Sequence, residues 1–340
     1  MATTTIEPKP SMWERPLSDV IALDWEKALY LVLILGAFVT RFYDLGTRAM
    51  SHDESLHTQY AWYLYEGRGF QHSPLMHGPL KFELTAFTYW LLGDNDFTAR
   101  IPTALMGVAA VGLFYYFRKW LGRAGALAGA VMMLISPYML YYSRYIRDEP
   151  YVITWGMLVA LCVINYMETR AAKYLYWLAA ISALFYATME ASFIYIAITM
   201  LFLGLHVVRE LFAVSWPNME DRRYFQIAFV VTLAAIVVAL ASLALSRASG
   251  EASGTATAAP ADPNAPLSTG ATGSPLSGVM LLAMVVAGGG LLAGTFFVFR
   301  AFGEELRRFP VLDVLMVLGL FVLPQLTAFP VRALGRNPVN

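Results

Sequence analysis

Long apolar stretches recur along almost the whole chain, and no other feature of the sequence constrains its fold as strongly. A helix that crosses a bilayer needs about 20 consecutive, mostly apolar residues. Hydrophobic residues make up 58% of the 340 residues and charged residues only 14%. Soluble domains, by comparison, are usually about 25% charged. The sequence therefore predicts an integral membrane protein.

The apolar segments predict an all-α, polytopic fold with about nine transmembrane helices. The first outer loop also carries the pattern of amphipathic helices that lie on the membrane surface. The nine spans are expected over residues 23–43, 98–117, 124–142, 151–167, 174–189, 191–208, 226–245, 278–299 and 311–329.

Lysine and arginine gather in the loops at one end of these spans, and such loops usually face the cytoplasm. We therefore expect a protein of the cell membrane with a cytoplasmic N-terminus and an extracytoplasmic active site. The cations in these loops are Arg118, Lys119, Arg123, Arg170, Lys173, Arg209, Arg222, Arg223, Arg300, Arg307 and Arg308.

The predicted topology divides the chain into three parts. Residues 1–27 form a cytoplasmic tail, and residues 28–210 form a helical core with a long outer loop over 44–97. Residues 211–340 add further spans around an outer loop at 246–277, which is rich in Ala, Gly, Pro, Ser and Thr. A segment of that composition cannot bury enough apolar surface to become ordered, so we expect this loop to be flexible.

The charge balance and the cysteine content bear on two further possibilities, a nucleic-acid partner and an intrachain disulfide. The 24 Lys and Arg residues balance the 24 Asp and Glu residues, so the composition gives no reason to expect a nucleic-acid partner. Cys162 is the single cysteine, which excludes an intrachain disulfide.

The first outer loop concentrates histidine and acidic residues. Asp53 lies four residues before His57 and Glu54 lies three before it, so on a helix each pair shares one face. Asp53 and His57 could bind a divalent metal, or they could serve as a base and its hydrogen-bond partner. A structural alternative stays open too, because Ser51 and Glu54 have the spacing of a helix capping box.

Two further outer segments carry charges. Arg144, Arg147 and Asp148 lie together in the second outer loop, and Glu190 occupies the third outer turn. Each also has a structural interpretation, since an acidic residue suits the start of a helix and Glu190 could simply mark a tight turn. We expect Asp53, Arg144, Asp148 and Glu190 to face one outer cavity.

These motifs resemble a known family. The sequence RFYDLG at 41–46, followed by HDE at 52–54, is similar to the opening of membrane glycosyltransferases with the GT-C fold. That group includes protein O-mannosyltransferases and the aminoarabinose transferases that modify lipid A. HGPL at 77–80 and the Arg-x-x-x-Asp spacing at 144–148 continue the pattern. The similarity covers about residues 28–210, and the closest match is a flippase-activity-associated family of archaeal-type protein glycosylation.

The resemblance implies a polyprenyl-phosphate-linked sugar as donor and a protein or glycolipid as acceptor. Some members use a divalent metal and others do not, so it leaves the cofactor open. It implies Asp53, Glu54 and Asp148 as catalytic residues, Arg144 and Arg147 as contacts to the donor phosphate, and His57, His77 and Glu190 as supporting residues.

The sequence departs from the family in two ways. Met189 stands where members often have a lysine, so another cation would have to neutralise the phosphate. Members also continue past a ninth span, whereas this sequence stops at Asn340. A second interpretation is therefore a non-catalytic accessory protein that binds lipid-linked sugars or helps to translocate them.

Overall fold

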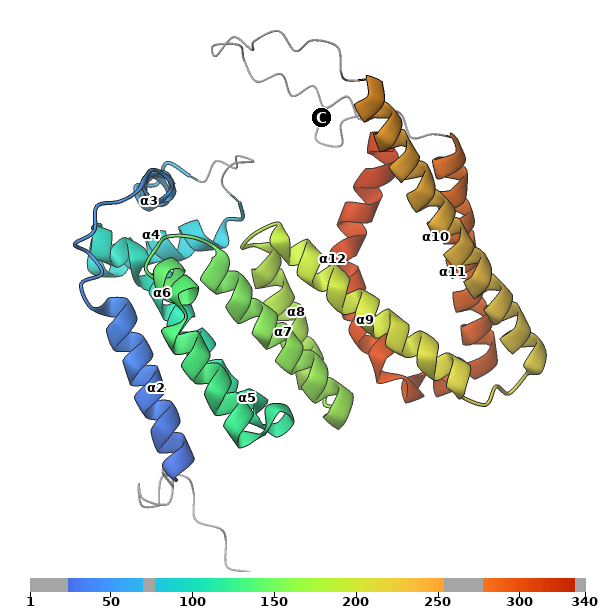
Figure 1. The fold of residues 1–340 in the computed structure, drawn as a ribbon, viewed down its shortest axis with the longest axis horizontal. Coiled ribbons are helices and arrows are strands. Elements are labelled where there is room, and N and C mark those ends of the chain that lie inside the picture. Colours follow the sequence, from blue (N-terminus) through green and yellow to red (C-terminus); the bar gives the residue numbers. More distant parts are fainter. Residues whose placement is uncertain (1–23, 70–76, 254–277, 334–340) are drawn as a thin grey trace, which may run out of the picture. The chain divides into compact units, whose positions relative to one another are not determined.

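The computed structural model describes residues 24–69, 77–253 and 278–333, and all its regular elements there are helices, as expected (Figure 1). They form two compact units, residues 1–199 and 200–340. The helices are α2 (Trp25–Phe42), α3 (His52–Tyr65), α4 (Leu80–Leu92), α5 (Asp96–Ile135), α6 (Pro137–Ser143), α7 (Glu149–Thr169), α8 (Lys173–Tyr186), α9 (Ala191–Ala213), α10 (Met219–Ser253), α11 (Gly278–Phe302), the 3₁₀ helix η1 (Gly303–Arg308) and α12 (Pro310–Ala333).

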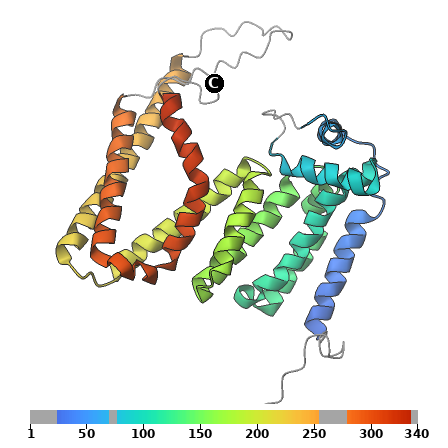
Figure 2. The ribbon, with the colours of Figure 1, turned by 180° about the vertical axis from the view of Figure 1, so that it is seen from behind.

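In the first unit, α2 packs against α5, α5 against α7, and α7 against α8. Figures 1 and 2 show that α3 and α4 lie across one end of these longer helices. Ala61 of α3, Phe82 and Tyr89 of α4, Ala99 of α5 and Ile146 form a buried apolar cluster at that end. This end is where the sequence places the outer face.

Helix α5 contains the whole of the expected span at 98–117 and part of the one at 124–142. Its 40 residues are interrupted at Gly122, whose φ of 71° belongs to the left-handed region that glycine adopts without steric cost. The second of the two spans ends earlier than expected, because Ser136 and Pro137 start the separate helix α6. The predicted span at 124–142 is therefore an α-helix only to Ile135, followed by a short second helix.

Helices occupy all nine expected positions, but not all of them are equally suited to a bilayer. Among the described residues, five segments are long and apolar enough to cross it: α5, α7, α9, Met219–Leu245 and Gly278–Arg308. These segments confirm a polytopic membrane protein, while the number nine remains a prediction. Helix α2 carries Glu26, Lys27 and Arg41 within its 18 residues, and α8 has only 14 residues.

Helix α3 begins with the predicted capping box of Ser51 and Glu54. It ends before Gly67, whose φ is 75°. Leu56, Tyr60 and Leu64 on its apolar side are partly buried against the apolar cluster at this end. The face that α3 buries consists of Glu54, His57, Thr58 and Ala61, because charged partners for that face come from elsewhere in the chain.

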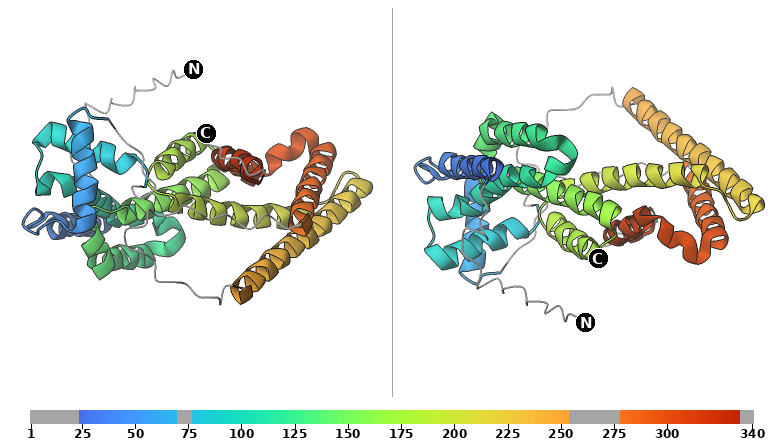
Figure 3. Two further views of the ribbon diagram at one scale, coloured as in Figure 1. Left: turned by 90° about the horizontal axis from the view of Figure 1, so that it is seen from above. Right: turned by 90° about the horizontal axis from the view of Figure 1, so that it is seen from below.

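In the second unit, α10 and α11 lie side by side (Figure 3). A side chain at Gly290 of α11 would collide with Thr232 of α10, so the close approach of the two helices depends on this glycine. Trp216, Phe225 and Phe302 make ring contacts at one end of the pair. The two helices thus associate through small residues and rings, as is common in membranes.

Several predictions concern residues outside the described ranges. These are most of the tail at 1–27, His72, residues 254–277 of the outer loop and residues 334–340. Helix α10 continues to Ser253, so residues 246–253 are helical and do not belong to the predicted loop.

Candidate active site

Two outer segments are joined by backbone hydrogen bonds. The amide of Gly78 donates to the carbonyl of Thr188 (3.0 Å), and the amide of Leu80 donates to the carbonyl of Ala187 (2.9 Å). A Cβ atom at Gly78 would overlap the backbone of Ala187, so only glycine permits this approach. The residues that lead into α4 are therefore fixed to the turn that precedes α9.

This junction brings two of the predicted supporting residues together. Nδ1 of His77 lies 2.8 Å from Oε2 of Glu190. The Glu190 side chain is 57% exposed, so the pair is open to solvent or to a bound molecule. Glu190 therefore contacts the segment that leads into α4, while a shared cavity with Asp53, Arg144 and Asp148 remains a prediction.

Asp53 contacts the second outer loop. Its Oδ2 lies 2.7 Å from Nη1 of Arg147, and Nη2 of Arg147 lies 3.3 Å from Oε1 of Glu149. Burial acts to lower the pKa of Arg147, but Glu149 and Asp53 outweigh it and raise that pKa. The side chain of Asp53 is 49% exposed. The carboxyl group of Asp53 and the guanidinium of Arg147 therefore lie together at a partly exposed position.

Glu54 has a different environment from its neighbour, because consecutive residues of a helix point in different directions. Its side chain is fully buried. It accepts hydrogen bonds from Nε of Arg100 (3.0 Å), Nη2 of Arg48 (2.7 Å) and the amide of Ile146 (3.3 Å). These donors occupy both carboxylate oxygens and tie α3 to α5 and to the second outer loop.

Arg144 contacts the C-terminal end of α2. Its guanidinium donates to the carbonyl oxygens of Thr40 (2.9 Å) and Asp44 (3.2 Å), rather than to Asp148. Together with Arg48, it lines a cavity of about 150 Å³, whose other walls are Leu45 and Tyr141. Arg48 also lies over the ring of Tyr145, at 5.1 Å from its centroid. The spacing of Arg144 and Asp148 therefore does not bring the two side chains into contact.

Sequence reasoning missed Lys81, which is the partner of Asp148. Nζ of Lys81 lies 2.7 Å from Oδ2 of Asp148, and the side chains are 1% and 2% exposed. Burial lowers the pKa of Lys81 and raises that of Asp148, while their mutual attraction opposes both shifts. The available signal was a lysine near the start of an apolar helix, directly after the HGPL motif at 77–80.

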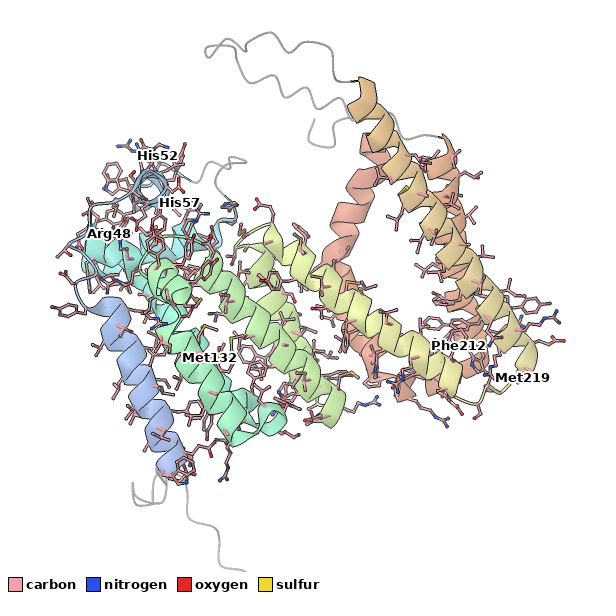
Figure 4. All side chains as sticks on the ribbon, in the orientation of Figure 1. Arg48, His52, His57, Met132, Phe212 and Met219 are labelled. Carbon is pink, nitrogen blue, oxygen red and sulfur yellow. The ribbon has the colours of Figure 1, made fainter. Side chains whose placement is uncertain are left out.

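His57 is buried, and Figure 4 labels it where α3 lies against α4. Its ring packs beside Phe82, with centroids 5.6 Å apart, and its Nδ1 has no hydrogen-bond partner. Burial, reinforced by the charges of Lys81 and neighbouring cations, lowers the pKa of His57 to about 3. The imidazole is therefore neutral at neutral pH.

The predicted metal site gains no further ligand from the structure. No group of three or more His, Cys, Asp or Glu side chains in the described ranges could hold a metal ion. Of the two predicted ligands, Asp53 is paired with Arg147, whereas His57 is buried.

Comparison with known proteins found one family similar to this chain. Residues 76–239 match the family of dolichyl-phosphate-mannose-protein mannosyltransferases. No curated protein and no solved structure matches the chain. The matched segment contains Lys81, Arg147 and Glu190. It begins after α3, so Asp53 lies outside it. The match covers just under half of the chain, and it supports a membrane glycosyltransferase of the GT-C type, the group that the sequence resembles.

Proposed function

We propose that the protein transfers a sugar from a polyprenyl-phosphate-linked donor to an acceptor on the extracytoplasmic face of the cell membrane. The pairing of half-exposed Asp53 with Arg147 carries this proposal. Sugar transfer needs a base for the acceptor and positive charge for the departing phosphate. Both are present within one contact, in a chain whose residues 76–239 match a family of mannosyltransferases.

In the proposed reaction, an acceptor hydroxyl attacks the anomeric carbon of the sugar. The bond between that carbon and the phosphate oxygen breaks, and polyprenyl phosphate leaves with the bonding electrons. Asp53 takes the proton of the acceptor hydroxyl, and Arg147 stabilises the negative charge that grows on the phosphate. The planar guanidinium of Arg147 suits this task because it can donate to two phosphate oxygens at once.

The other predicted residues take different parts in this proposal. Arg144, which with Arg48 lines the small cavity near α2, supplies a second contact for the donor phosphate. Glu54 and Asp148 are buried in ion pairs, so we assign them to holding the site together rather than to proton transfer. His77 and Glu190 border the cluster on the side of α9.

The proposed orientation depends on the distribution of cations. At the end of the first unit opposite α3, Arg123 pairs with Glu26 (3.3 Å), and Lys119 pairs with Glu168. Loops rich in Lys and Arg usually remain in the cytoplasm. The end that carries Asp53 is then extracytoplasmic.

The test is transfer of labelled sugar from polyprenyl-phosphate donors by the purified full chain in lipid nanodiscs. Asp53→Asn keeps the shape of the side chain but removes the base. We expect transfer to fall by about 100-fold or more. The matched control is Asp96→Asn, an exposed aspartate at the start of α5, which should keep full activity. Undiminished transfer by Asp53→Asn would show that Asp53 is not the base.

One observation favours the accessory-protein alternative. Of the three carboxylates first expected to be catalytic, Glu54 and Asp148 form buried ion pairs, and only Asp53 is accessible. If the wild-type protein binds polyprenyl-phosphate sugars but transfers none of them, this alternative replaces the transferase proposal.

A further inference from the structure

The loop that carries Arg147 is anchored on both sides of this residue. On one side, Ile146 is 1% exposed, and its amide donates to the buried Glu54. On the other side, the carboxylate of Asp148 lies in the buried contact with Lys81. The backbone that presents Arg147 is thus held at the residue before it and at the residue after it.

Lys81 is itself fixed in space by the backbone contacts of its own segment. It follows Leu80, whose amide bonds to Ala187. A continuous series of polar contacts therefore runs from the turn before α9, through Lys81, Asp148 and Arg147, to Asp53. Among the described residues, these contacts join α4, the second outer loop and α3.

Stability alone does not account for a buried ion pair at this point. Replacing such a pair by apolar residues of similar size is often neutral or even stabilising, because desolvating two charges is costly. A charged contact differs from an apolar one in being directional, so it defines where each partner lies. The pair also leaves Oδ1 of Asp148 without a hydrogen-bond partner, which is a further cost of placing the carboxylate there.

We propose that Lys81 is a positioning residue, whose contact with Asp148 fixes the second outer loop so that Arg147 is held against Asp53. Lys81 does not touch the substrate in this proposal, since its side chain is 1% exposed. The kinetic part of the proposal rests on the transferase function proposed above. The geometric part does not, and it can be measured without any sugar donor.

The geometric test is cross-linking between positions 53 and 147. Asp53→Cys and Arg147→Cys are introduced together with Cys162→Ser, which removes the single native thiol, and a short bifunctional maleimide is added. The yield is compared with that in the same protein carrying Lys81→Met and Asp148→Asn. We expect the yield to fall several-fold in this neutral-pair variant. An unchanged yield in the folded variant would overturn the proposal.

The kinetic test uses the neutral-pair variant with intact Asp53 and Arg147. Misplacement of a reacting group by about 1 Å can cost about 100-fold in rate, so we expect kcat to fall by about this factor. The KM for the donor should stay within about twofold of the wild-type value, because a positioning residue does not bind the donor. A raised KM with an unchanged kcat would instead show that Lys81 contacts the donor.

Two controls keep the outcome interpretable. Lys119→Met removes a lysine from an exposed ion pair at the other end of the unit and should leave cross-linking and kcat unchanged. If the neutral-pair variant does not fold, the reversed pair Lys81→Asp with Asp148→Lys restores an ionic contact. We expect its cross-linking yield to approach that of the wild-type background, and a low yield in the folded reversed variant contradicts the proposal. If no donor supports transfer by the wild type, the proposed function fails, while the cross-linking result still decides this inference.

Discussion

The two units of the chain use their helices differently. In α5 and α7 of the first unit, 50% and 56% of the most apolar stretch is buried, compared with 11% in α10 and 17% in the segment containing α11. The first unit also buries five charged side chains at its outer end: Arg41, Glu54, Lys81, Arg100 and Asp148. In the described part of the second unit, Asp221 is the one buried charged side chain, and it pairs with Arg300.

This difference shows that a polar site on membrane helices requires buried charged contacts in addition to apolar packing. Apolar side chains facing one another in lipid define a helix pair only loosely, because lipid tails are equally apolar. Buried charges must meet specific partners at specific distances, and an unmet partner is costly. The first unit therefore has the means to hold polar groups at fixed positions, and the predicted site residues lie at the end of that unit that carries α3 and α4.

The largest expected effect comes from removing a buried charge in the first unit. Glu54→Ala leaves Arg100, which is also fully buried, without its carboxylate partner. We expect a loss of about 3–5 kcal/mol of unfolding free energy. The measurement is denaturant unfolding of the purified protein in detergent.

The double variant Glu54→Ala with Arg100→Met separates the two possible causes of that loss, because it keeps the truncation at position 54 and removes the unpaired charge. If the unpaired charge is responsible, the double variant should be more stable than Glu54→Ala, because no buried charge remains alone. Equal destabilisation of the two variants would mean that the lost packing, rather than the charge, accounts for the effect.

A smaller effect is expected where the second unit depends on close helix contact. Gly290→Leu places a large side chain where Thr232 lies, so α10 and α11 must separate. Such overpacking costs about 1–3 kcal/mol. Because the contact lies within the second unit, cross-linking between positions 53 and 147 should be unchanged.

Gly289→Leu is the matched control for this substitution, since a side chain at the neighbouring Gly289 meets open space. Its unfolding free energy should remain close to that of the wild type. Loss of cross-linking in Gly290→Leu would show that the two units do not behave separately.

The smallest expected effect is on the pH dependence of the unfolding free energy. It compares a histidine in the first unit with one in the second. His57 is neutral in the folded protein down to about pH 3, whereas an unfolded histidine takes up a proton near pH 6.5. Below pH 6.5 the unfolded state therefore binds more protons, and stability falls as the pH falls. The contribution is at most about 1.4 kcal/mol for each pH unit between 6.5 and 3.

Unfolding of the wild type and of His57→Gln should be measured between pH 7.5 and 5. We expect the wild type to lose more stability over this range, because glutamine does not titrate. His206→Gln in the second unit is the control, since that histidine is partly exposed. Parallel curves for the wild type and His57→Gln would show that burial does not keep His57 neutral.

Much of the fold could be predicted from sequence because it follows from local composition. Apolar runs gave helices at the expected places, and Ser51 with Glu54 gave the start of α3. The exceptions were also local, since Gly122 interrupts α5 and Pro137 starts a new helix. The buried face of α3 was not predicted, because sequence periodicity does not reveal that Arg100 of α5 pairs with Glu54.

The site was less predictable, since its contacts join residues far apart in the chain. The sequence pointed to Asp53, Arg147 and Glu190 through residue type and loop position, and the structure places them in neighbouring outer segments. It did not reveal that Lys81 pairs with Asp148 across 67 positions or that Arg100 pairs with Glu54 across 46. No spacing rule connects residues at such separations.

The sequence by itself determined that this is a helical membrane protein whose cations favour one face and whose unusual acids gather near the other. Composition and charge distribution suffice for that, because the bilayer acts on each segment separately. Only the tertiary structure decided which acid remains accessible. Asp53 and Glu54 are adjacent acidic residues, yet Asp53 is half exposed beside Arg147, whereas Glu54 is buried against arginines. That distinction arises from side chains brought in by other helices, and no local rule contains it.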